Sequence, residues 1–420
     1  MSNVNINIPQ NVKLIINTLE DAGYEAFAVG GCVRDALMGR VPNDWDITTS
    51  ATPMQVKELF RRTIDTGIKH GTVTIMLGKE GYEVTTYRID GDYMDGRHPD
   101  KVIFTNNLIE DLKRRDFTIN AMAYNERVGI VDAFDGINDL ENKIIRCVGE
   151  ATERFTEDAL RILRALRFSA QLDFNINEAT AVAVKELGKN LSLISKERIQ
   201  TELDKLITSN CPDRIKLVHL YGLNKFIFEG ASSINEDCLS LYENISSIME
   251  SLPNNHYLRW AALMHYEAEP SVVLRKLKFD NVTINTCSKL VNAAHTPLPD
   301  NKPALRRMIV KYGKDIFDNY LFTYIHSLCA TCLYDHGSSD HVTLVEKLYK
   351  EIISDNDCIS TKDMAIGGTV LLKEGIESGK KMGDVINYLF ERVLDEPSLN
   401  EYDTLLSIAK NYYISLQPHE

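Results

Sequence analysis

The sequence lacks the long apolar segments that a membrane protein or a secreted precursor needs. Its 420 residues contain no run of about 18 apolar residues, and the first ten carry no charged stretch followed by an apolar one. No tract rich in proline, glycine and serine occurs, and hydrophobic residues at 44% and charged residues at 25% are ordinary for a folded chain. We therefore expect a soluble, folded, cytoplasmic protein with no membrane partner. The length exceeds what one hydrophobic core supports, so we expect several structural units.

A disulfide framework is also missing. The eight cysteines are scattered, and Cys32, Cys147, Cys238 and Cys287 lie in hydrophobic contexts typical of reduced core thiols. Cys329 to Cys332 forms one CxxC, but it has no second pair at zinc spacing and lies in an apolar helical stretch. A structural role for this CxxC is favoured over a metal or redox site.

An overall positive charge, the usual mark of phosphate binding, is absent too. The formal net charge is -13, with acidic excess concentrated after about residue 220. Basic residues gather only locally, from Lys113 to Arg115 and from Arg161 to Arg167. An acidic body with focused basic patches is compatible with RNA binding but does not predict it.

What the sequence does contain is a mixed α/β region followed by helices. Within residues 24–148 we expect a small sheet with flanking helices, and from Thr152 onward helical periodicity takes over. The hairpin is the clearest element, because Gly78 and Gly81 suit the tight turn between its strands. The expected strands are Phe27–Val29, Trp45–Thr48, Thr72–Leu77 and Tyr82–Arg88, and the expected helices of this region are Val33–Met38 and Met54–Arg62.

Two glycines and two aspartates form the sharpest local pattern. Gly30 and Gly31 follow an apolar strand, where backbone N–H groups can approach a triphosphate, and Arg34 can pair with its oxygens. Asp44 and Asp46 alternate with Trp45 on the expected strand, so both carboxylates project to one side and can hold two hard divalent cations. The pattern is no Walker A loop. From the residues alone, a strand-to-helix turn with Asp35 in a surface ion pair stays open.

A helix expected from about Thr156 carries a second polar constellation. Asp158, Arg161, Arg164 and Arg167 fall along one arc, with an apolar arc of leucines and Ile162 opposite. Asp158 can accept from the amino group of cytosine or adenine and Arg161 can donate to their ring acceptors, whereas uracil and guanine present mismatched groups. The helix is thereby able to replace a template strand. A solvated basic face is the alternative for Arg164 and Arg167.

Four motifs in this order resemble one enzyme family. The GG…RD…DxD segment is similar to the head of the polymerase β-type nucleotidyltransferases, and residues 114–121 (RRDFTINA) to a motif of class II tRNA nucleotidyltransferases and related bacterial poly(A) polymerases. Residues 157–161 (EDALR) and 195–199 (SKERI) resemble two further motifs of the family, so the resemblance covers roughly residues 25–205. It implies an α+β fold, with a nucleotidyltransferase head on a small mixed sheet and an all-α C-terminal half. The expected domains are the head at 1–150, a nucleotide-selecting neck at 151–215, a helical body at 216–305 and a tRNA-binding tail at 306–420.

The resemblance also implies roles for the residues. Two Mg²⁺ ions would be held by Asp44 and Asp46, Gly31 and Arg34 would contact the nucleotide, and Arg115 would lie beside it. Asp158 and Arg161 would select the base, while Arg164 and Arg167 would contact phosphates or the base stack. Glu83, on the hairpin strand, is a candidate third carboxylate whose facing the sequence leaves open.

The activity that this resemblance predicts is addition of C, C and A to the 3′ end of tRNA from CTP and ATP. The uninterrupted segment Thr85–Phe104, expected to be a loop beside the hairpin, favours full CCA addition, because relatives that add only CC lack part of it. Alternatives are a poly(A) polymerase, an A-adding tRNA nucleotidyltransferase and a non-catalytic RNA-binding relative. Residues 258–265 (LRWAALMH) resemble the entry helix of a phosphohydrolase domain, but Tyr266 follows His265 where that domain places aspartate, so a structural His265 is favoured. The oligomeric state stays open.

Overall fold

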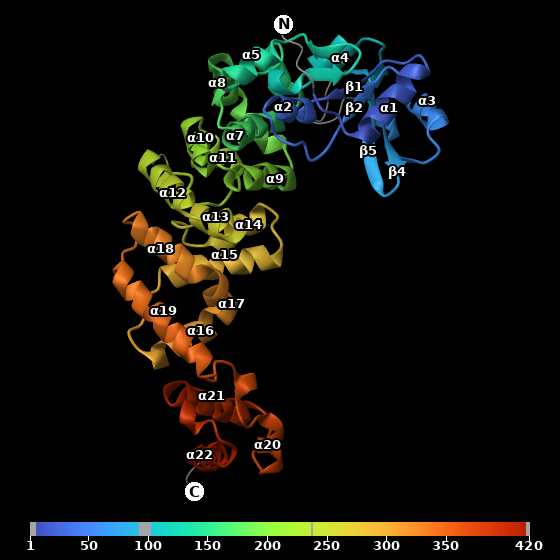
Figure 1. Cartoon of the computed structure of the whole chain (residues 1–420). Coiled ribbons are helices and arrows are strands. Elements are labelled where there is room, and N and C mark those ends of the chain that lie inside the picture. The colour runs from blue at the N-terminus through green and yellow to red at the C-terminus, as the bar shows by residue number, and fades with distance from the viewer. Residues whose placement is uncertain (1–5, 92–101, 237, 417–420) are drawn as a thin grey trace. The chain divides into compact units, whose positions relative to one another are not determined.

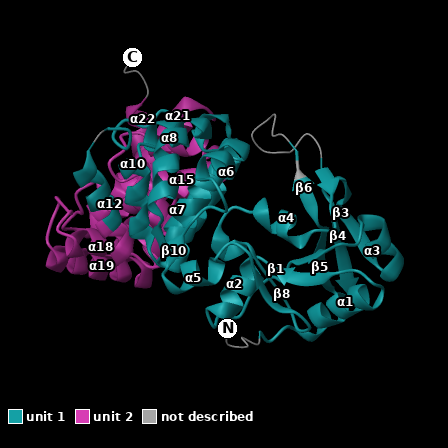
Figure 2. Ribbon diagram, turned by 90° about the horizontal axis from the view of Figure 1, so that it is seen from above, with its two compact units in different colours: residues 1–246, 276–279 teal, residues 247–275, 280–420 magenta. Residues whose placement is uncertain are grey.

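The computed structural model describes residues 6–91, 102–236 and 238–416 (Figure 1). The chain forms two compact units, teal and magenta in Figure 2. Unit 1 comprises Met1–Ser246 and Lys276–Phe279, and unit 2 comprises Ser247–Arg275 and Asp280–Glu420. The finer division into head, neck, body and tail remains a prediction.

Unit 1 begins with a seven-stranded mixed sheet in the order β3-β4-β5-β2-β1-β8-β9. Its neighbouring strands are antiparallel except β2 and β5, which are parallel. The strands are β1 (Ala26–Val29), β2 (Ile47–Thr49), β3 (Thr63–Gly67), β4 (Thr72–Leu77), β5 (Glu80–Thr86), β8 (Met122–Asn125) and β9 (Gly129–Asp132). The predicted α+β class, a mixed sheet followed by a helix-rich remainder, is confirmed.

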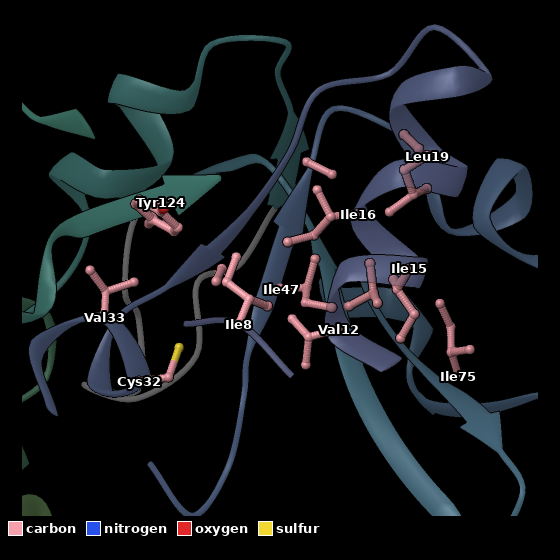
Figure 3. Close-up of a cluster of buried hydrophobic side chains, with 14 of the residues drawn as sticks. Ile8, Val12, Ile15, Ile16, Leu19, Cys32, Val33, Ile47, Ile75 and Tyr124 are labelled. Carbon is pink, nitrogen blue, oxygen red and sulfur yellow. The ribbon is translucent and has the colours of Figure 1, made fainter. Parts of the chain in front are cut away.

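One face of this sheet is covered by α1 (Gln10–Asp21). Val12, Ile15, Ile16 and Leu19 are buried, and their spacing places them along one stripe of the helix. Figure 3 shows this stripe facing buried side chains of β2 and β4, and we call the resulting cluster the head core. Truncating Ile15 to alanine would leave a cavity costing about 2 to 5 kcal/mol. The head core therefore fixes the sheet whose strand ends carry the candidate site.

The other helices of unit 1 lie beside the sheet and in the segment that follows it. They are α2 (Gly31–Leu37), α3 (Pro53–Leu59), α4 (Leu108–Lys113), α5 (Gly136–Glu141), α6 (Ala151–Glu157), α7 (Leu160–Leu172), α8 (Glu178–Leu187), α9 (Lys196–Ile207), α10 (Lys216–Leu220) and α11 (Asn224–Ile227), with a short 3-10 turn, η2 (Thr118–Asn120). The chain passes from unit 1 to unit 2 within α12 (Leu239–Ser251).

Two small ladders depart from the expectations. Strand β11 (Asn175–Ile176) pairs with β10 (Ile144–Ile145), so the region after Thr152 is not purely helical. Of the expected loop Thr85–Phe104, residues 92–101 lie outside the described residues, while the flanking β6 (Arg88–Asp90) and β7 (Val102–Phe104) pair as antiparallel strands. Both ladders are too short to show as alternating patterns in the sequence.

Unit 2 consists of helices throughout its described part. They are α13 (His256–Leu263), α14 (Pro270–Lys276, which ends in unit 1), α15 (Asn281–Ala294), α16 (Lys302–Tyr312), α17 (Lys314–Ile316), α18 (Phe322–Ala330), α19 (Ser339–Ser354), α20 (Gly368–Lys373), α21 (Lys380–Asp395) and α22 (Tyr402–Ser415). Arg306 joins three of its segments, since it pairs with Asp357 at 2.7 Å and donates to the carbonyl of Leu394 at 2.8 Å. Both charged side chains are buried, so the ion pair holds the segment after α19 to α16, and the bond to Leu394 holds α21 there.

His265 and the cysteines have structural roles in the fold. His265 is buried, stacked on His295 at 4.5 Å, and 3.0 Å from the hydroxyl of Tyr324, as a core histidine would be. All eight cysteines are free thiols; Cys32, Cys147 and Cys287 are buried, whereas Cys238 is partly exposed. Within the described residues, no helix combines the length and the hydropathy that crossing a membrane requires.

Candidate active site

The paired aspartates lie in the segment that leads into β2. The strand was predicted over Trp45–Thr48 but begins at Ile47, so Asp44 and Asp46 precede it. The segment nevertheless runs beside β1, because the N–H of Val29 donates to the carbonyl of Asp46 at 3.0 Å. Trp45 packs against the head core while both carboxylates are exposed, so the alternation of side chains expected from the sequence is present.

The surroundings of Asp46 destabilise the charged form of its carboxyl group. Desolvation by the surrounding protein raises the pKa of Asp46, the like charge of Asp44 adds to this rise, and Arg115 opposes it. Two neighbouring carboxylates with one nearby guanidinium carry an excess of negative charge. Such a pair attracts a cation.

Gly30 and Arg115 fit closely against each other. Gly30 adopts φ 82° and ψ -130°, a conformation that residues with a side chain rarely adopt. A Cβ there would also lie 3.0 Å from Nη1 of Arg115. Gly31 then begins α2. Gly30 thus lets the guanidinium of Arg115 lie directly on the backbone turn.

Arg34 is buried at the base of this turn, with 8% of its surface exposed. Its Nε donates to Asp35 at 2.9 Å and its Nη1 donates to Oδ1 of Asn120 at 2.6 Å. Asp35 therefore forms the ion pair that the sequence left open, and its partner is the adjacent residue, Arg34. Arg34 lies beneath the turn and not on its surface.

A chain of hydrogen bonds continues from Asn120 to α7. Nδ2 of Asn120 donates to Oδ1 of Asp116 at 3.1 Å, and Nε of Arg164 donates to Oδ2 of Asp116 at 2.8 Å. Burial alone would raise the pKa of Asp116, but Arg164 and Asn120 outweigh it and bring the pKa to about 2. The head sheet and α7 are thereby joined through a buried, ionised carboxylate.

The second constellation is arranged differently from the prediction. The helix expected from Thr156 is interrupted: α6 ends at Glu157, Asp158 is extended (φ -142°, ψ 102°), and α7 begins at Leu160. The cause is local capping, because Oδ1 of Asp158 accepts from the N–H of Leu160 at 3.0 Å. Asp158 therefore stands at a helix junction and not on a continuous arc with the arginines. The opposite, apolar arc is buried as predicted: Leu160, Ile162, Leu163 and Leu166.

Each charged group of this constellation is bound by protein partners. Oδ2 of Asp158 accepts from Nη2 of Arg198 at 2.8 Å. Arg161 donates through Nη1 to Glu157 at 2.7 Å and through Nη2 to the carbonyl of Arg114 at 3.0 Å. Glu157, Asp158 and Arg161 are thus held at one junction.

Arg164 and Arg167 are not a solvated basic face. Arg164 pairs with Asp116, and Arg167, 7% exposed, pairs with Glu202 at 3.2 Å. With Arg34 they surround the ring of Phe168, at 5.2, 5.4 and 4.2 Å from its centroid for Arg34, Arg164 and Arg167. Three guanidinium groups thus pack around one buried ring, and each is paired with a carboxylate of its own.

The segment Lys113–Arg115 links the two constellations. The carbonyl of Lys113 accepts from Arg154 at 3.1 Å, and the carbonyl of Arg114 accepts from Arg161 at 3.0 Å. The next residue, Arg115, acts electrostatically on Asp46. Three consecutive residues thus lie between the aspartate pair and the helix junction.

Comparisons with known proteins match this geometry to a family. Residues 26–146 match the model of the Poly A polymerase head domain, residues 173–234 that of the probable RNA and SrmB-binding site of polymerase A, and residues 253–409 that of tRNA nucleotidyltransferase domain 2. A CCA-adding enzyme of Leuconostoc mesenteroides is 36% identical over 400 residues, covering 95% of each chain. The chain belongs to the CCA-adding enzyme family.

Other members of the CCA-adding enzyme family match most of the length of the chain. The enzyme of Lacticaseibacillus paracasei is 36% identical over 409 residues, with 94% of each chain covered. The crystal structure of the Bacillus stearothermophilus CCA-adding enzyme in complex with CTP superposes with a TM-score of 0.77 and 31% identity, covering 97% of this chain and 98% of that one. The resemblance carried by the four motifs is confirmed, and it extends into the helical half that the motifs did not reach.

Sequence reasoning about the CCA-adding enzyme motifs missed two residues of α9. Arg198 binds Asp158 and Glu202 binds Arg167, but the SKERI motif and the helix that it opens predict no role for either residue. Their spacing of four residues on a helix was the available signal, because it places both on one face. The positive Arg198 faces the negative Asp158, and the negative Glu202 faces the positive Arg167.

Glu83 is near the aspartate pair of this CCA-adding enzyme family member without completing a metal cluster. Glu83 comes directly before Val84 in β5, and Asp46 comes directly before Ile47, the first residue of β2. Val84 and Ile47 are register partners. Asp44, Asp46 and Glu83 line one cavity of about 1000 Å³. Within the parts of the chain that the structure describes, however, no three His, Cys, Asp or Glu side chains are grouped to hold a metal ion.

Proposed function

We propose that this chain adds C, C and A in turn to the 3′ end of tRNA, from CTP and ATP, without a nucleic-acid template and in the cytoplasm. The observation that carries the proposal is the position of Lys113–Arg115 between two constellations. Arg161 binds the carbonyl of Arg114, and Arg115 acts on Asp46, so the base-selecting junction and the aspartate pair share one short segment of unit 1. A single nucleotide can span such a site with its base at one end and its phosphates at the other.

Asp44 and Asp46 are proposed to hold two Mg²⁺ ions. Their donor set fits, because Mg²⁺ prefers oxygen ligands and is commonly bound by one or two carboxylates together with substrate phosphates. Desolvation, and after it the like charge of Asp44, raise the pKa of Asp46, and a bound cation would oppose both effects. Bound there, the ions would activate the attacking hydroxyl and stabilise the leaving phosphate.

Asp158 and Arg161 are proposed to select cytosine and adenine. The two protein bonds to Asp158 leave acceptor capacity on its carboxylate, and a guanidinium carries more donors than the bonds made by Arg161 use. Uracil and guanine would leave groups at this junction unpaired, at about 1 to 3 kcal/mol each.

The remaining cations are proposed to serve the nucleotide in two ways. Arg115, 20% exposed, can contact phosphates beside Gly31, and Arg164, 33% exposed, can contact the nucleotide while staying bound to Asp116. Arg34 and Arg167 are buried and each is paired with a carboxylate, so we assign them to the shape of the site and to the positions of its neighbours.

The proposed reaction is a nucleotidyl transfer. The RNA 3′-hydroxyl forms a bond to the α-phosphorus of the nucleotide, the α–β phosphoanhydride bond breaks, and pyrophosphate leaves. The protein residues orient the base, hold the triphosphate and keep the charges in place; none forms a covalent bond to the substrate. Positioning and electrostatics are therefore the contribution of this chain.

A primer-extension assay tests the proposal. tRNA that ends before CCA is incubated with the protein, Mg²⁺ and CTP, ATP or both, and product length and base identity are read by sequencing. The proposal requires C, C, A and then termination. Long A tails on a generic RNA would indicate a poly(A) polymerase, addition only after CC would indicate an A-adding enzyme, and binding without extension would indicate a non-catalytic relative.

Substitution of the aspartates provides the matched test of the metal assignment. Asp44→Asn and Asp46→Asn should abolish extension while tRNA binding persists, whereas Asp65→Asn, which changes an exposed ion pair with Lys57 in the same sheet, should leave extension unchanged. Undiminished extension by either active-site variant would reject the assignment.

A further inference from the structure

Two arginines bind the carbonyls at the end of α4. Helix α4 ends at Lys113, and the final carbonyls of a helix have no partner within it. Nη1 of Arg154 donates to the carbonyl of Lys113 at 3.1 Å, and Nη2 of Arg161 donates to that of Arg114 at 3.0 Å. Positive charge at a helix C-terminus is also favourable. Because Arg154 belongs to α6 and Arg161 to α7, the end of α4 is fixed to both sides of the break between those helices.

Glu157, the last residue of α6, lies between these two arginines. Its Oε1 pairs with Nη2 of Arg154 at 2.5 Å, and its Oε2 accepts from Nη1 of Arg161 at 2.7 Å. The carboxylate thus gives one oxygen to each guanidinium. The side chains of Arg154 and Arg161 are each 11% exposed and that of Glu157 is 23% exposed, so water screens the two pairs only partly. Arg154 therefore helps to fix Glu157, and Glu157 helps to fix Arg161.

The orientation of Arg161 decides which of its N–H groups are free for a base. It donates to Glu157, to the carbonyl of Arg114 and, at 3.4 Å, to the carbonyl of Arg154. A guanidinium has more donors than these bonds use. If Glu157 moved, the attraction between the charges would turn Arg161 with it, and the remaining donors would change direction. A base edge is read only by donors that keep a fixed direction.

We propose that Arg154 is a positioning residue for base selection. It acts through Glu157, whose carboxylate it holds so that Arg161 stays directed at the ring acceptors of cytosine and adenine. Its bond to Lys113 ties the same junction to α4. The inference rests on the proposed function and adds to it a residue outside the four motifs, since the EDALR motif begins at Glu157.

The choice between CTP and UTP tests this role in the full-length protein. The ratio of kcat/KM for CTP to that for UTP is measured for the first addition to tRNA that ends before CCA. Uracil has an N–H donor where cytosine has a ring acceptor, so a loosely held guanidinium separates the two less well. Arg154→Gln should lower the ratio about 10-fold, within what loss of one charge-assisted hydrogen bond accounts for. Arg154→Lys keeps a positive charge beside Glu157 and should stay within about 3-fold of wild type.

Arg306→Gln is the matched control for a general loss of stability. Arg306 is also a buried arginine that pairs with a carboxylate, Asp357, and donates to a carbonyl near the end of a helix, that of Leu394 in α21. It lies in unit 2, so its replacement should destabilise the protein and leave the ratio at the wild-type value. An unchanged ratio in Arg154→Gln, or an equal fall in Arg306→Gln, would overturn the proposal.

Two further measurements separate the route through Glu157 from the bond to Lys113. In a Glu157→Gln background, Arg154→Gln should lower the ratio no further, because the link is already broken. Inhibition by inorganic tripolyphosphate, which has phosphates but no base, should be the same in Arg154→Gln as in wild type. Additive effects on the ratio, or a matching loss of tripolyphosphate inhibition, would mean that Arg154 acts through Lys113 on Arg115, and the proposal would be wrong.

The outcomes distinguish this inference from the proposed function. If the wild-type protein extends no RNA, the proposed function fails and this inference fails with it. If it adds C, C and A while Arg154→Gln selects as wild type does, only the role of Arg154 fails. Should Arg154→Gln not fold, Glu157→Gln breaks the same link from its other end, and a wild-type ratio in that variant would overturn the role of Arg154.

Discussion

Arg198 donates through Nη2 to Oδ2 of Asp158 at 2.8 Å, while the other oxygen of that carboxylate accepts from the N–H of Leu160 at 3.0 Å. The carboxylate is therefore held from two sides, by a residue 40 positions later and by the helix that it caps. Its orientation is set by the protein alone, which is what the proposed selection of the base by a fixed hydrogen-bonding edge requires.

Replacing Arg198 should loosen this selection. In Arg198→Gln the charge-assisted bond is lost at about 1.5 to 3 kcal/mol, so we expect kcat/KM for CTP and ATP to fall roughly 10- to 100-fold and misincorporation of UTP to rise. Single-nucleotide extension with each of the four nucleotides measures both. Arg214→Gln, which removes an ion pair with Asp173 elsewhere in unit 1, is the control. Unaltered discrimination in Arg198→Gln would show that Asp158 needs no such support.

Asp116 should be critical for the stability of unit 1. Asp116→Asn keeps the shape but leaves the buried side of Arg164 without its counter-ion, which we expect to cost about 3 to 5 kcal/mol. The pKa of about 2 in the folded protein lies below the value of about 3.9 for a free aspartate, so its stabilisation is present above pH about 3.9 and is lost as the pH falls toward 2.

Urea unfolding of wild type and Asp116→Asn from pH 7 to pH 3 measures this effect. The difference in unfolding free energy should be constant at neutral pH and should shrink below about pH 4. A difference independent of pH would mean that the ionised carboxylate is not what stabilises the fold.

The sequence predicted those elements whose cause is local. The strand Thr72–Leu77 was predicted with the bounds that it has, because alternating side chains and two turn glycines define it within a few residues. The apolar arc of α7 was predicted for the same reason. The order of the four motifs was enough to identify the family, because each motif is a contiguous segment that can be recognised without knowing which residues it contacts in the fold.

The misplaced features depend on contacts between distant residues. Asp158 caps α7 locally, but its second oxygen is held by Arg198, 40 positions later, and helical periodicity does not reveal that partner. Arg164 and Arg167 read as a basic surface because their partners, Asp116 and Glu202, lie 48 and 35 positions away. Charge patterns along the chain cannot distinguish a solvated arginine from one that is neutralised by a distant carboxylate.

Close packing at Gly136 predicts a sharp response to one added methyl group. A Cβ at this position would lie 2.4 Å from the carbonyl oxygen of Thr118 in η2, a backbone atom that cannot move alone. Gly136→Ala should therefore destabilise unit 1 by about 1 to 3 kcal/mol. Gly383→Ala, in α21 with nothing within 4 Å of the added atom, should be neutral or stabilising by up to about 1 kcal/mol. Thermal melts against wild type compare the two; a harmless Gly136→Ala would mean that α5 and η2 are not packed as described.

The buried histidine of unit 2 predicts how stability depends on pH. Burial first, and then His295, lower the pKa of His265 to about 3, far below the value of about 6.5 for a free histidine. Between these values the unfolded chain binds a proton that the folded chain does not. Stability is therefore full above pH about 6.5 and falls as the pH drops toward 3, by up to about 1.4 kcal/mol per pH unit.

His265→Phe removes the titrating group while filling a similar volume, and the hydroxyl of Tyr324 keeps its bond to the carbonyl of Ala261. Urea unfolding of unit 2 between pH 7 and pH 4.5, followed in the full-length protein by hydrogen exchange of α13 and α15, should then show a shallower dependence on pH than wild type. Equal slopes for wild type and His265→Phe would mean that His265 takes up its proton without unfolding, and that the cluster around Tyr324 is open to water.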